Sequence, residues 1–308
     1  MTFSLDEVFS SIYRAANTLP IDTFAKSIRF GEHKSRLRGE GHDFDRIVEY
    51  DPQAHSVSQI DWRSKDFKGQ VYVRESRVTK DFPVIVMADL SSSMLFGIDQ
   101  QYKERMLLEV VGDIGLAAFH SQDPLGLIGF AENIIFDEEP KVGESHVYYL
   151  LSELYEFFQG ISSDGKGKLN KLRTNFYEAF SFFLRKHTNK QCFLIVISDF
   201  ITADDIVGSE ILKDIAAQHE VVFIFLDDPT EFSDRGLGHV QLEDMETGKQ
   251  IVIPRRKLKV IRDRSKFQRK ETRRQLNNLG IDSIVLEYGK HFQRLHRFFI
   301  SRYESLRA

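Results

Sequence analysis

The stretch Pro83-Val-Ile-Val-Met-Ala-Asp-Leu-Ser-Ser-Ser-Met94 decides the fold. Residues 83–88 form a continuous apolar run, which is typical of a strand buried on both faces of a sheet. The run stops at Asp89, and hydroxyl side chains follow at once. In open α/β sheets ligands bind beyond the carboxyl ends of the strands, so we expect a functional site at this point.

The rest of the chain repeats this strand pattern in alternation with helices. Similar short apolar runs occupy residues 125–130, 192–197, 221–226 and 283–286. Apolar residues recur at helical spacing over residues 106–117, 176–184 and 292–306. This alternation predicts an α/β fold with a mostly parallel sheet and helices on both faces. Residues 133–136 follow the preceding strand too closely for a helical crossover, so we expect one antiparallel edge strand there.

Two parts of the chain differ from this pattern. Residues 1–20 predict a helix, because Ser4 and Glu7 have the spacing of a capping box. Glycines then punctuate short charged segments over residues 28–77, which indicates a small β-rich module. We therefore expect an N-terminal helix and β-rich module over 1–80 and an α/β domain over 81–308. Within that domain, residues 231–256 read as a hairpin excursion.

Composition excludes several classes of protein. The chain has 308 residues, of which 42% are hydrophobic and 29% charged, so it suits a packed core and excludes intrinsic disorder. A single cysteine, Cys192, excludes an internal disulfide framework and a cysteine-based zinc site. The N-terminus lacks the basic and apolar regions of a secretory signal, and the longest apolar runs are far too short to span a bilayer. We therefore expect a cytoplasmic protein without a membrane span.

Oxygen-bearing side chains gather at the predicted strand ends. Asp89, Ser91 and Ser93 alternate directly after the first buried strand, and Asp199 follows the strand at 192–197. Thr174 precedes the helix that lies between these strands. Carboxylate and hydroxyl oxygens are hard ligands that suit Mg²⁺, Mn²⁺ or Ca²⁺ rather than zinc or copper. Each residue alone also fits ordinary turn and helix-cap chemistry, so the prediction of a metal site depends on the joint arrangement.

Neutral hydroxyls give this predicted site a specific chemical character. Three hydroxyl groups neutralise none of the charge of an ion, so the ion would stay electrophilic if Asp89 and Asp199 act mainly through water or as outer hydrogen-bond acceptors. It would then attract a carboxylate from outside, such as an Asp or Glu of a partner protein. The pattern thus favours a non-enzymatic interaction module over a catalyst.

The same residues resemble the metal-ion-dependent adhesion site of the von Willebrand factor A domain. Further stretches, Glu40-Gly-His-Asp-Phe44, Ile60-Asp-Trp-Arg63 and Asp123-Pro-Leu-Gly126, resemble the bacterial family called domain of unknown function fifty-eight. The resemblance covers residues from about 36 to the C-terminus. It implies a Rossmann-like von Willebrand A fold with an N-terminal β module. By association it also implies a MoxR-type AAA+ ATPase as partner, with this chain as an adaptor in assembly or chaperone-like work.

Two stretches depart from the family pattern. Residues 52–58 read Pro-Gln-Ala-His-Ser-Val-Ser where the family usually has a Pro-Gly-Asp turn followed by Arg. Leu172 and Arg173 precede Thr174, whereas many relatives have glycine before the threonine. Since glycine permits a positive φ and a close backbone approach, the loop before Thr174 could have a different shape here.

Residues 255–274 form a strongly basic stretch. They include eleven Lys or Arg and two acids, Asp263 and Glu271. The simplest interpretation is a solvated helix that directs Val260, Phe267 and Leu276 inward. The alternative is an electrostatic surface for nucleic acid, anionic lipid or an acidic protein, with nucleic acid possible but not favoured.

An enzymatic alternative also stays open. A metal-dependent phosphoester hydrolase could use the same oxygen ligands, although no histidine or lysine is assignable as its general base. The sequence contains no His-Glu-x-x-His motif, no Gly-x-Ser-x-Gly elbow and no Walker A motif. We therefore expect no enzymatic activity.

Overall fold

The computed structural model describes most of the chain, as residues 3–18, 43–49, 72–77, 83–94, 102–163, 172–188, 190–200, 206–227, 239–243, 250–254 and 256–307. Contacts divide the chain into two units, of which the larger comprises Met1–Arg29 and Phe82–Ala308. The smaller unit comprises Phe30–Asp81.

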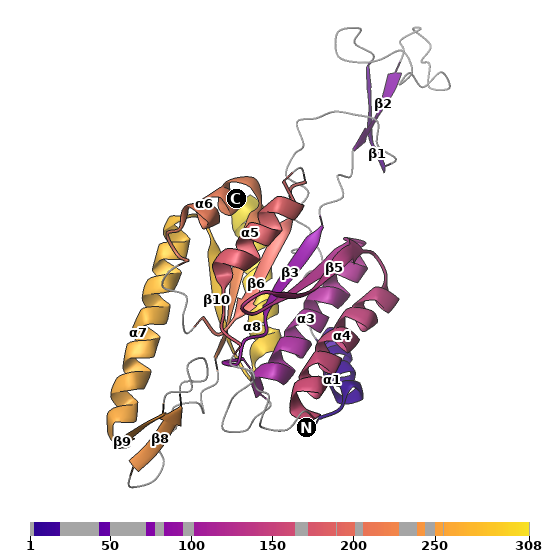
Figure 1. Cartoon of the computed structure of the whole chain (residues 1–308). Coiled ribbons are helices and arrows are strands. Elements are labelled where there is room, and N and C mark those ends of the chain that lie inside the picture. Colours follow the sequence, from indigo (N-terminus) through magenta and orange to yellow (C-terminus); the bar gives the residue numbers. More distant parts are fainter. Residues whose placement is uncertain are drawn as a thin grey trace. The chain divides into compact units, whose positions relative to one another are not determined.

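A six-stranded sheet forms the centre of the larger unit (Figure 1). Its strands are β3 (Val84–Asp89), β4 (Leu125–Phe130), β5 (Ile134–Lys141), β6 (Phe193–Ser198), β7 (Glu220–Asp227) and β10 (Asp282–Glu287). Their spatial order is β10-β7-β6-β3-β4-β5, and every neighbouring pair is parallel except β4 with β5. The Rossmann-like α/β fold predicted from the sequence is thus confirmed, including the antiparallel edge strand.

Helices cover both faces of the sheet. Those of the larger unit are α1 (Leu5–Thr18), α3 (Tyr102–Ser121), α4 (Glu144–Ser163), α5 (Phe176–Lys186), α6 (Glu210–Gln218), α7 (Arg256–Asn278) and α8 (His291–Arg307). Helix α3 packs against α1, α4 and α8, whereas α5 packs against α6 over the opposite face. Side chains alternate along each strand, so β3 and β6, which are buried throughout, supply apolar residues to both layers.

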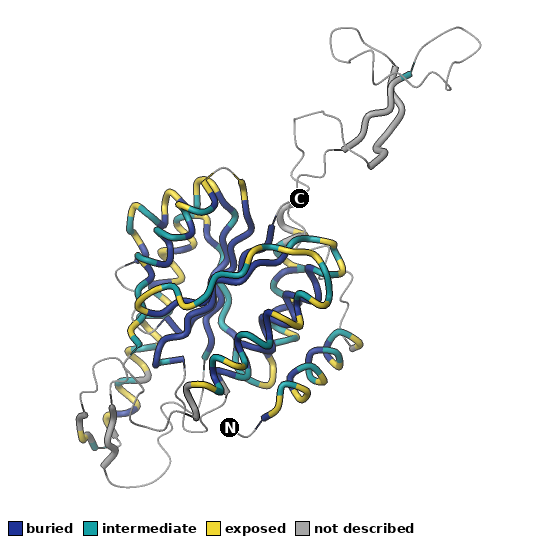
Figure 2. The backbone as a smooth tube through the Cα atoms, turned by 45° about the vertical axis from the view of Figure 1, so that its right-hand side comes forward, coloured by how far each residue is buried: buried dark blue, intermediate teal, exposed yellow. Residues whose placement is uncertain are grey.

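An aromatic core lies between the sheet and α5. Phe176, Phe180 and Phe183 recur along α5 at intervals of four and three residues, and all three are buried. They pack with strand residues such as Phe223 and Phe225 in one continuous cluster. Figure 2 shows this burial as dark strands enclosed by helices whose outer faces are exposed. This core fixes the ends of the strands on which the polar residues are carried.

Helix α1 packs on the larger unit. The backbone N–H of Glu7 donates to the Ser4 side chain at 3.2 Å, as the predicted cap requires. Val8 and Ile12 are fully buried, and the Tyr13 hydroxyl donates to the Glu144 carboxylate on α4. The structure therefore places this helix with the larger unit, whereas the sequence grouped it with residues 1–80.

Two antiparallel strand pairs form two-stranded sheets of their own. In the smaller unit, β1 (Asp43–Glu49) pairs with β2 (Tyr72–Arg77), which agrees with a β-rich module. In the larger unit, β8 (His239–Glu243) pairs with β9 (Gln250–Pro254), in agreement with the predicted hairpin. The departure at residues 52–58 lies outside the described residues.

Helix α7 packs at the β10 edge of the sheet, through only one of the three side chains predicted to point inward, Leu276. Leu258 and Leu276 are buried, and Leu276 belongs to the aromatic core cluster. Val260 and Phe267 are 66% and 68% exposed, so the prediction that they point inward is wrong. The buried face of α7 thus includes Leu258 and Leu276, and its exposed face includes Val260 and Phe267.

None of the helices in the described part of the chain combines the length and apolar character that crossing a bilayer requires.

Candidate metal site

The predicted site residues lie where the strand order reverses. From β3 the chain first builds β4 and β5 on one side, and later builds β6, β7 and β10 on the other side. Asp89 is the last residue of β3, and Asp199 directly follows β6, its neighbour in the sheet. In open α/β sheets, the point where the strand order reverses is the usual ligand site, at the carboxyl ends of the strands.

A tight loop after β3 positions the serine hydroxyls. The Leu90 N–H donates to the Phe130 carbonyl at 2.7 Å and so ties the start of the loop to β4. The Ser91 N–H turns back and donates to Asp89 Oδ1 at 2.9 Å. The loop brings the hydroxyl oxygens of Ser91 and Ser93 within 3.0 Å of each other. The Asp-x-Ser-x-Ser spacing therefore makes these groups converge.

Thr174 reaches the same point from the start of α5. Its hydroxyl donates to Asp89 Oδ2 at 3.3 Å. The cap of α5 is the next residue, Asn175, whose side chain accepts from the Glu178 N–H. The threonine hydroxyl is therefore not used in capping and is directed toward the carboxylate.

The loop before Thr174 keeps its approach without glycine. The Ser92 N–H donates to the Leu172 carbonyl at 2.8 Å, and the Leu172 N–H donates to the Ser92 hydroxyl at 2.9 Å. Neither Leu172 nor Arg173 has a positive φ. Arg173 is exposed. The absence of glycine thus changes which side chains precede Thr174, but it does not prevent this loop from bonding to the loop after β3.

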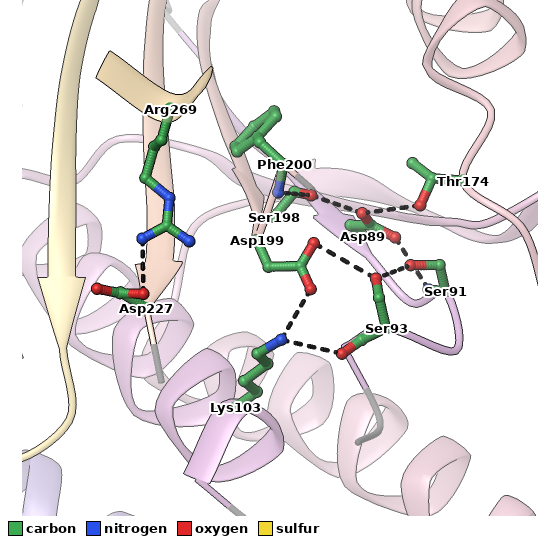
Figure 3. Close-up of polar contacts among 10 residues, drawn as sticks. All are labelled: Asp89, Ser91, Ser93, Lys103, Thr174, Ser198, Asp199, Phe200, Asp227 and Arg269. Atoms are coloured by element: carbon green, nitrogen blue, oxygen red, sulfur yellow. Dashed lines mark hydrogen bonds and ion pairs between the residues drawn. The ribbon is translucent and has the colours of Figure 1, made fainter. Parts of the chain in front are cut away.

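Asp199 completes the constellation (Figure 3). The Ser93 hydroxyl donates to Asp199 Oδ1 at 3.3 Å. All the residues predicted as metal ligands thus lie in one hydrogen-bonded group, which we call the oxygen cluster: Asp89, Ser91, Ser93, Thr174 and Asp199. Both aspartates are buried, whereas Ser93 and Thr174 are only half-buried. The cluster therefore reaches toward the surface through its hydroxyl side.

Sequence reasoning missed two residues that contact the oxygen cluster. The Ser198 hydroxyl donates to Asp89 Oδ2 at 2.6 Å and accepts from the Phe200 N–H at 3.0 Å. The Lys103 ammonium donates to Asp199 Oδ2 at 2.9 Å and to the Ser93 carbonyl at 3.2 Å. A signal for the lysine did exist, because Lys103 precedes Met106 and Leu107 by three and four residues and so shares their buried face.

Phe200 links the turn after β6 to the aromatic core. It has a φ of +50°, which is uncommon for a residue with a side chain. Its ring stacks on Phe176 with an interplanar angle of 5° and lies 4.5 Å from the ring of Phe225. The packing of this ring holds the unusual backbone conformation and thereby fixes Asp199.

The electrostatics of the oxygen cluster fit a bound cation. Complete burial, together with the charge of Asp199, raises the pKa of Asp89 to about 7, although hydrogen bonds from Ser198 and Ser91 oppose the rise. The negative charges of Asp89 and Asp199 are therefore not fully compensated by the groups around them. A nearby cation would stabilise the ionised form of Asp89 and so lower its pKa. Because the donors are carboxylate and hydroxyl oxygens, the residues present suit a hard divalent ion.

A family comparison agrees with part of this picture. The family model described as "Protein of unknown function DUF58" matches residues 48–277. The chain belongs to the DUF58 family. The matched region includes the complete oxygen cluster of this DUF58 member, and the family predicted from the sequence is thereby confirmed. No protein of curated function matches the chain.

Several solved structures are similar to this DUF58 member. One is the conserved hypothetical protein BatB from Bacteroides thetaiotaomicron, with 17% identity, coverage of 73% of this chain and 99% of the other, and a TM-score of 0.47. Another is an aerotolerance-related membrane protein from Bacteroides fragilis, with 15% identity, coverage of 72% and 99%, and a TM-score of 0.41. A third is the pilus adhesin SpaC from Lactobacillus rhamnosus GG, with 11% identity, coverage of 73% and 30%, and a TM-score of 0.37.

Proposed function

We propose that this protein is a non-enzymatic interaction module that binds a partner carboxylate through a divalent cation at a von Willebrand A-type adhesion site. The observation that carries the proposal is the convergence of Asp89, Ser91, Ser93, Thr174 and Asp199 in one cluster at the switch point of the sheet. Mg²⁺ is the favoured ion, with Mn²⁺ or Ca²⁺ as substitutes.

The residues of the oxygen cluster divide this work. The hydroxyls of Ser91, Ser93 and Thr174 offer neutral oxygens. Ser93 and Thr174 are half-buried and lie where a partner can approach, whereas Ser91 is buried. The carboxylates of Asp89 and Asp199 lie deeper and are held by hydrogen bonds from neighbouring groups. A bound divalent cation would supply the positive centre to which an Asp or Glu of the partner binds.

For the partner, we propose a MoxR-type AAA+ ATPase in the bacterial cytoplasm. Membership of the DUF58 family supports this choice, because the resemblance to that family implies a MoxR-type ATPase as partner. In this role the chain serves as an adaptor in metal-dependent assembly or chaperone-like work.

The test is a pull-down from the native host with the tagged full chain in Mg²⁺ or EDTA. We expect chelation to abolish capture of the ATPase, and Ser93→Ala and Thr174→Val to weaken it at least ten-fold. Both substitutions remove a half-buried hydroxyl, so the fold should survive. Ser152→Ala, which removes a half-buried hydroxyl on α4, is the matched control.

Two results would contradict the proposal. Capture that persists unchanged in EDTA and in the Ser93 and Thr174 variants would exclude a metal-bridged carboxylate. Turnover of a generic phosphoester in Mg²⁺ or Mn²⁺ that disappears with Ser93→Ala would favour the hydrolase instead.

A second candidate function rests on α7. Its outer ridge, defined as Lys257, Val260, Arg264, Phe267, Lys270 and Arg274, is largely exposed and alternates cations with apolar side chains. Clustered cations on one helix face attract polyanions, and an exposed ring such as Phe267 can stack on an unpaired base. We propose single-stranded nucleic acid as the ligand to test.

Fluorescence anisotropy of a labelled oligonucleotide measures this binding. We expect affinity to fall steeply with salt, and Arg264→Glu with Lys270→Glu to abolish binding. Phe267→Ala should weaken it by about ten-fold, as expected for the loss of one stacking contact. Binding that is absent or insensitive to salt would contradict this second function.

A further inference from the structure

Lys103 is a buried cation in direct contact with the oxygen cluster. Its side chain is 2% exposed, and its ammonium lies 2.9 Å from Asp199 Oδ2, whose side chain is 3% exposed. Figure 3 shows it approaching the cluster from α3, on the side of Asp199 away from Asp89. Because water is largely excluded around this pair, its charges act on each other and on the cluster with little screening.

Lys103 is firmly held in this position. It lies in the first turn of α3, one turn before the fully buried residues Met106 and Leu107. Its second hydrogen bond, to the Ser93 carbonyl at 3.2 Å, ties the helix to the serine loop. Moving the ammonium away would break both contacts and leave Asp199 buried without this partner, which is costly.

The lysine changes the charge balance of the site. With both carboxylates ionised, Asp89 and Asp199 contribute −2, and Lys103 brings this to −1. A divalent cation then leaves a net charge of +1, which a carboxylate from outside neutralises. Without the lysine, the cation alone would already neutralise the two aspartates.

From this balance we infer that Lys103 makes cation binding conditional on the partner carboxylate. The inference rests on the proposed adhesion function and concerns the regulation of that same site. The fixed ammonium weakens binding of the cation by itself and strengthens the attraction of the bound cation for a carboxylate. Cation and partner therefore bind cooperatively, and each raises the affinity of the protein for the other by the same factor.

Titration of the full chain with Mn²⁺, followed by calorimetry and by the electron paramagnetic resonance signal of free Mn²⁺, tests the inference. Acetate at 0.2 M serves as the carboxylate probe, with an equal concentration of chloride as its reference. We expect acetate to tighten Mn²⁺ binding by the unmodified protein several-fold. Lys103→Met should bind Mn²⁺ roughly ten-fold tighter in chloride and gain little or nothing from acetate.

Two further variants control for structure. Lys103→Arg keeps the charge and should retain both the weaker Mn²⁺ binding and its enhancement by acetate. Lys213→Met removes an exposed lysine on α6, outside the cluster, and should behave as the unmodified protein does. Thermal unfolding adds a second readout, because Lys103→Met should unfold earlier than the unmodified protein without Mn²⁺ and recover with it.

The possible failures are distinguishable. If Lys103→Met binds Mn²⁺ no tighter than the unmodified protein, or if acetate tightens binding equally in both, the inference about Lys103 is overturned while the metal site stands. If neither protein binds Mn²⁺ and neither is stabilised by it, the proposed adhesion site itself fails.

Discussion

His219 lies buried at the end of α6, with its ring 4.9 Å from that of Phe183. Its Nδ1 accepts a hydrogen bond from the Cys192 N–H at 3.3 Å. Burial, aided by the neighbouring His187, lowers its pKa from 6.5 to about 4. In the unfolded chain, His219 is protonated at a higher pH than in the folded protein. The contribution of His219 to the free energy of unfolding is therefore fully present above about pH 6.5 and is lost as the pH drops toward 4. We expect a loss of roughly 3 kcal/mol across this window.

Urea denaturation between pH 4.5 and 7.5 measures the loss. Other groups titrate over the same range, so the comparison is with His219→Asn, whose side chain can still accept from the Cys192 N–H but does not ionise. The variant should lose less stability on acidification than the unmodified protein. Equal pH dependence of both proteins would show that His219 contributes nothing to it.

Single residues also show how far the sequence predicts the site. Asp89, Ser91, Ser93, Thr174 and Asp199 follow from the rule that parallel strands end at one edge, so their convergence could be predicted. Ser198 and Lys103 could not be assigned with the same certainty. The role of Ser198 depends on the face of β6 to which its side chain points, and that of Lys103 on the rotation of α3 about its axis. The pattern of apolar residues determines both features only coarsely.

Helix α7 shows the same limit at the scale of an element. Leu276 is fully buried in the core, whereas Phe267 is 68% exposed. We expect Leu276→Ala to lower the free energy of unfolding by about 2–5 kcal/mol. Phe267→Ala should change it by less than about 0.5 kcal/mol. Chemical denaturation of both variants checks the pair, and a large loss for the Phe267 variant would contradict the exposed position.

The packing of α1 on α3 depends on a missing side chain. A Cβ at Gly112 would lie 2.2 Å from Ile12 Cδ1 and 3.1 Å from Leu151 Cδ1. We therefore expect Gly112→Ala to destabilise the protein by about 1–3 kcal/mol, despite the better helix propensity of alanine. At Gly160, in α4, a Cβ meets nothing within 4 Å among the described residues, so Gly160→Ala should be neutral or stabilising. Thermal unfolding of the two variants distinguishes these outcomes.

Among whole elements, the strands were the most predictable. Continuous apolar runs such as residues 192–197 have few ways to be buried other than inside a sheet, and the edge strand followed from its short connection. The position of α1 was not predictable in the same way. Its apolar stripe shows that it packs on something, but a stripe does not identify the surface that receives it.

At the scale of the molecule, the larger unit contains the sheet, the core and the oxygen cluster. We expect that replacing residues 30–81 with a flexible Gly/Ser linker leaves a protein that unfolds cooperatively and keeps its circular dichroism in the helical region. Truncation after residue 278 is the contrasting variant, because it removes β10 and the buried Leu295 and Phe299 of α8. If the variant that lacks residues 30–81 is unfolded, the larger unit needs the smaller one in order to fold.

The ring of Phe200 has a consequence for the behaviour of the molecule on heating. The residue that fixes Asp199 is also packed among Phe176, Phe223 and Phe225, so site and core share one set of contacts. Ligand sites on mobile loops often melt before the domain that carries them. For the proposed cation site, the loss of binding and the loss of tertiary structure should therefore coincide at a single temperature, with no folded but binding-incompetent state between them.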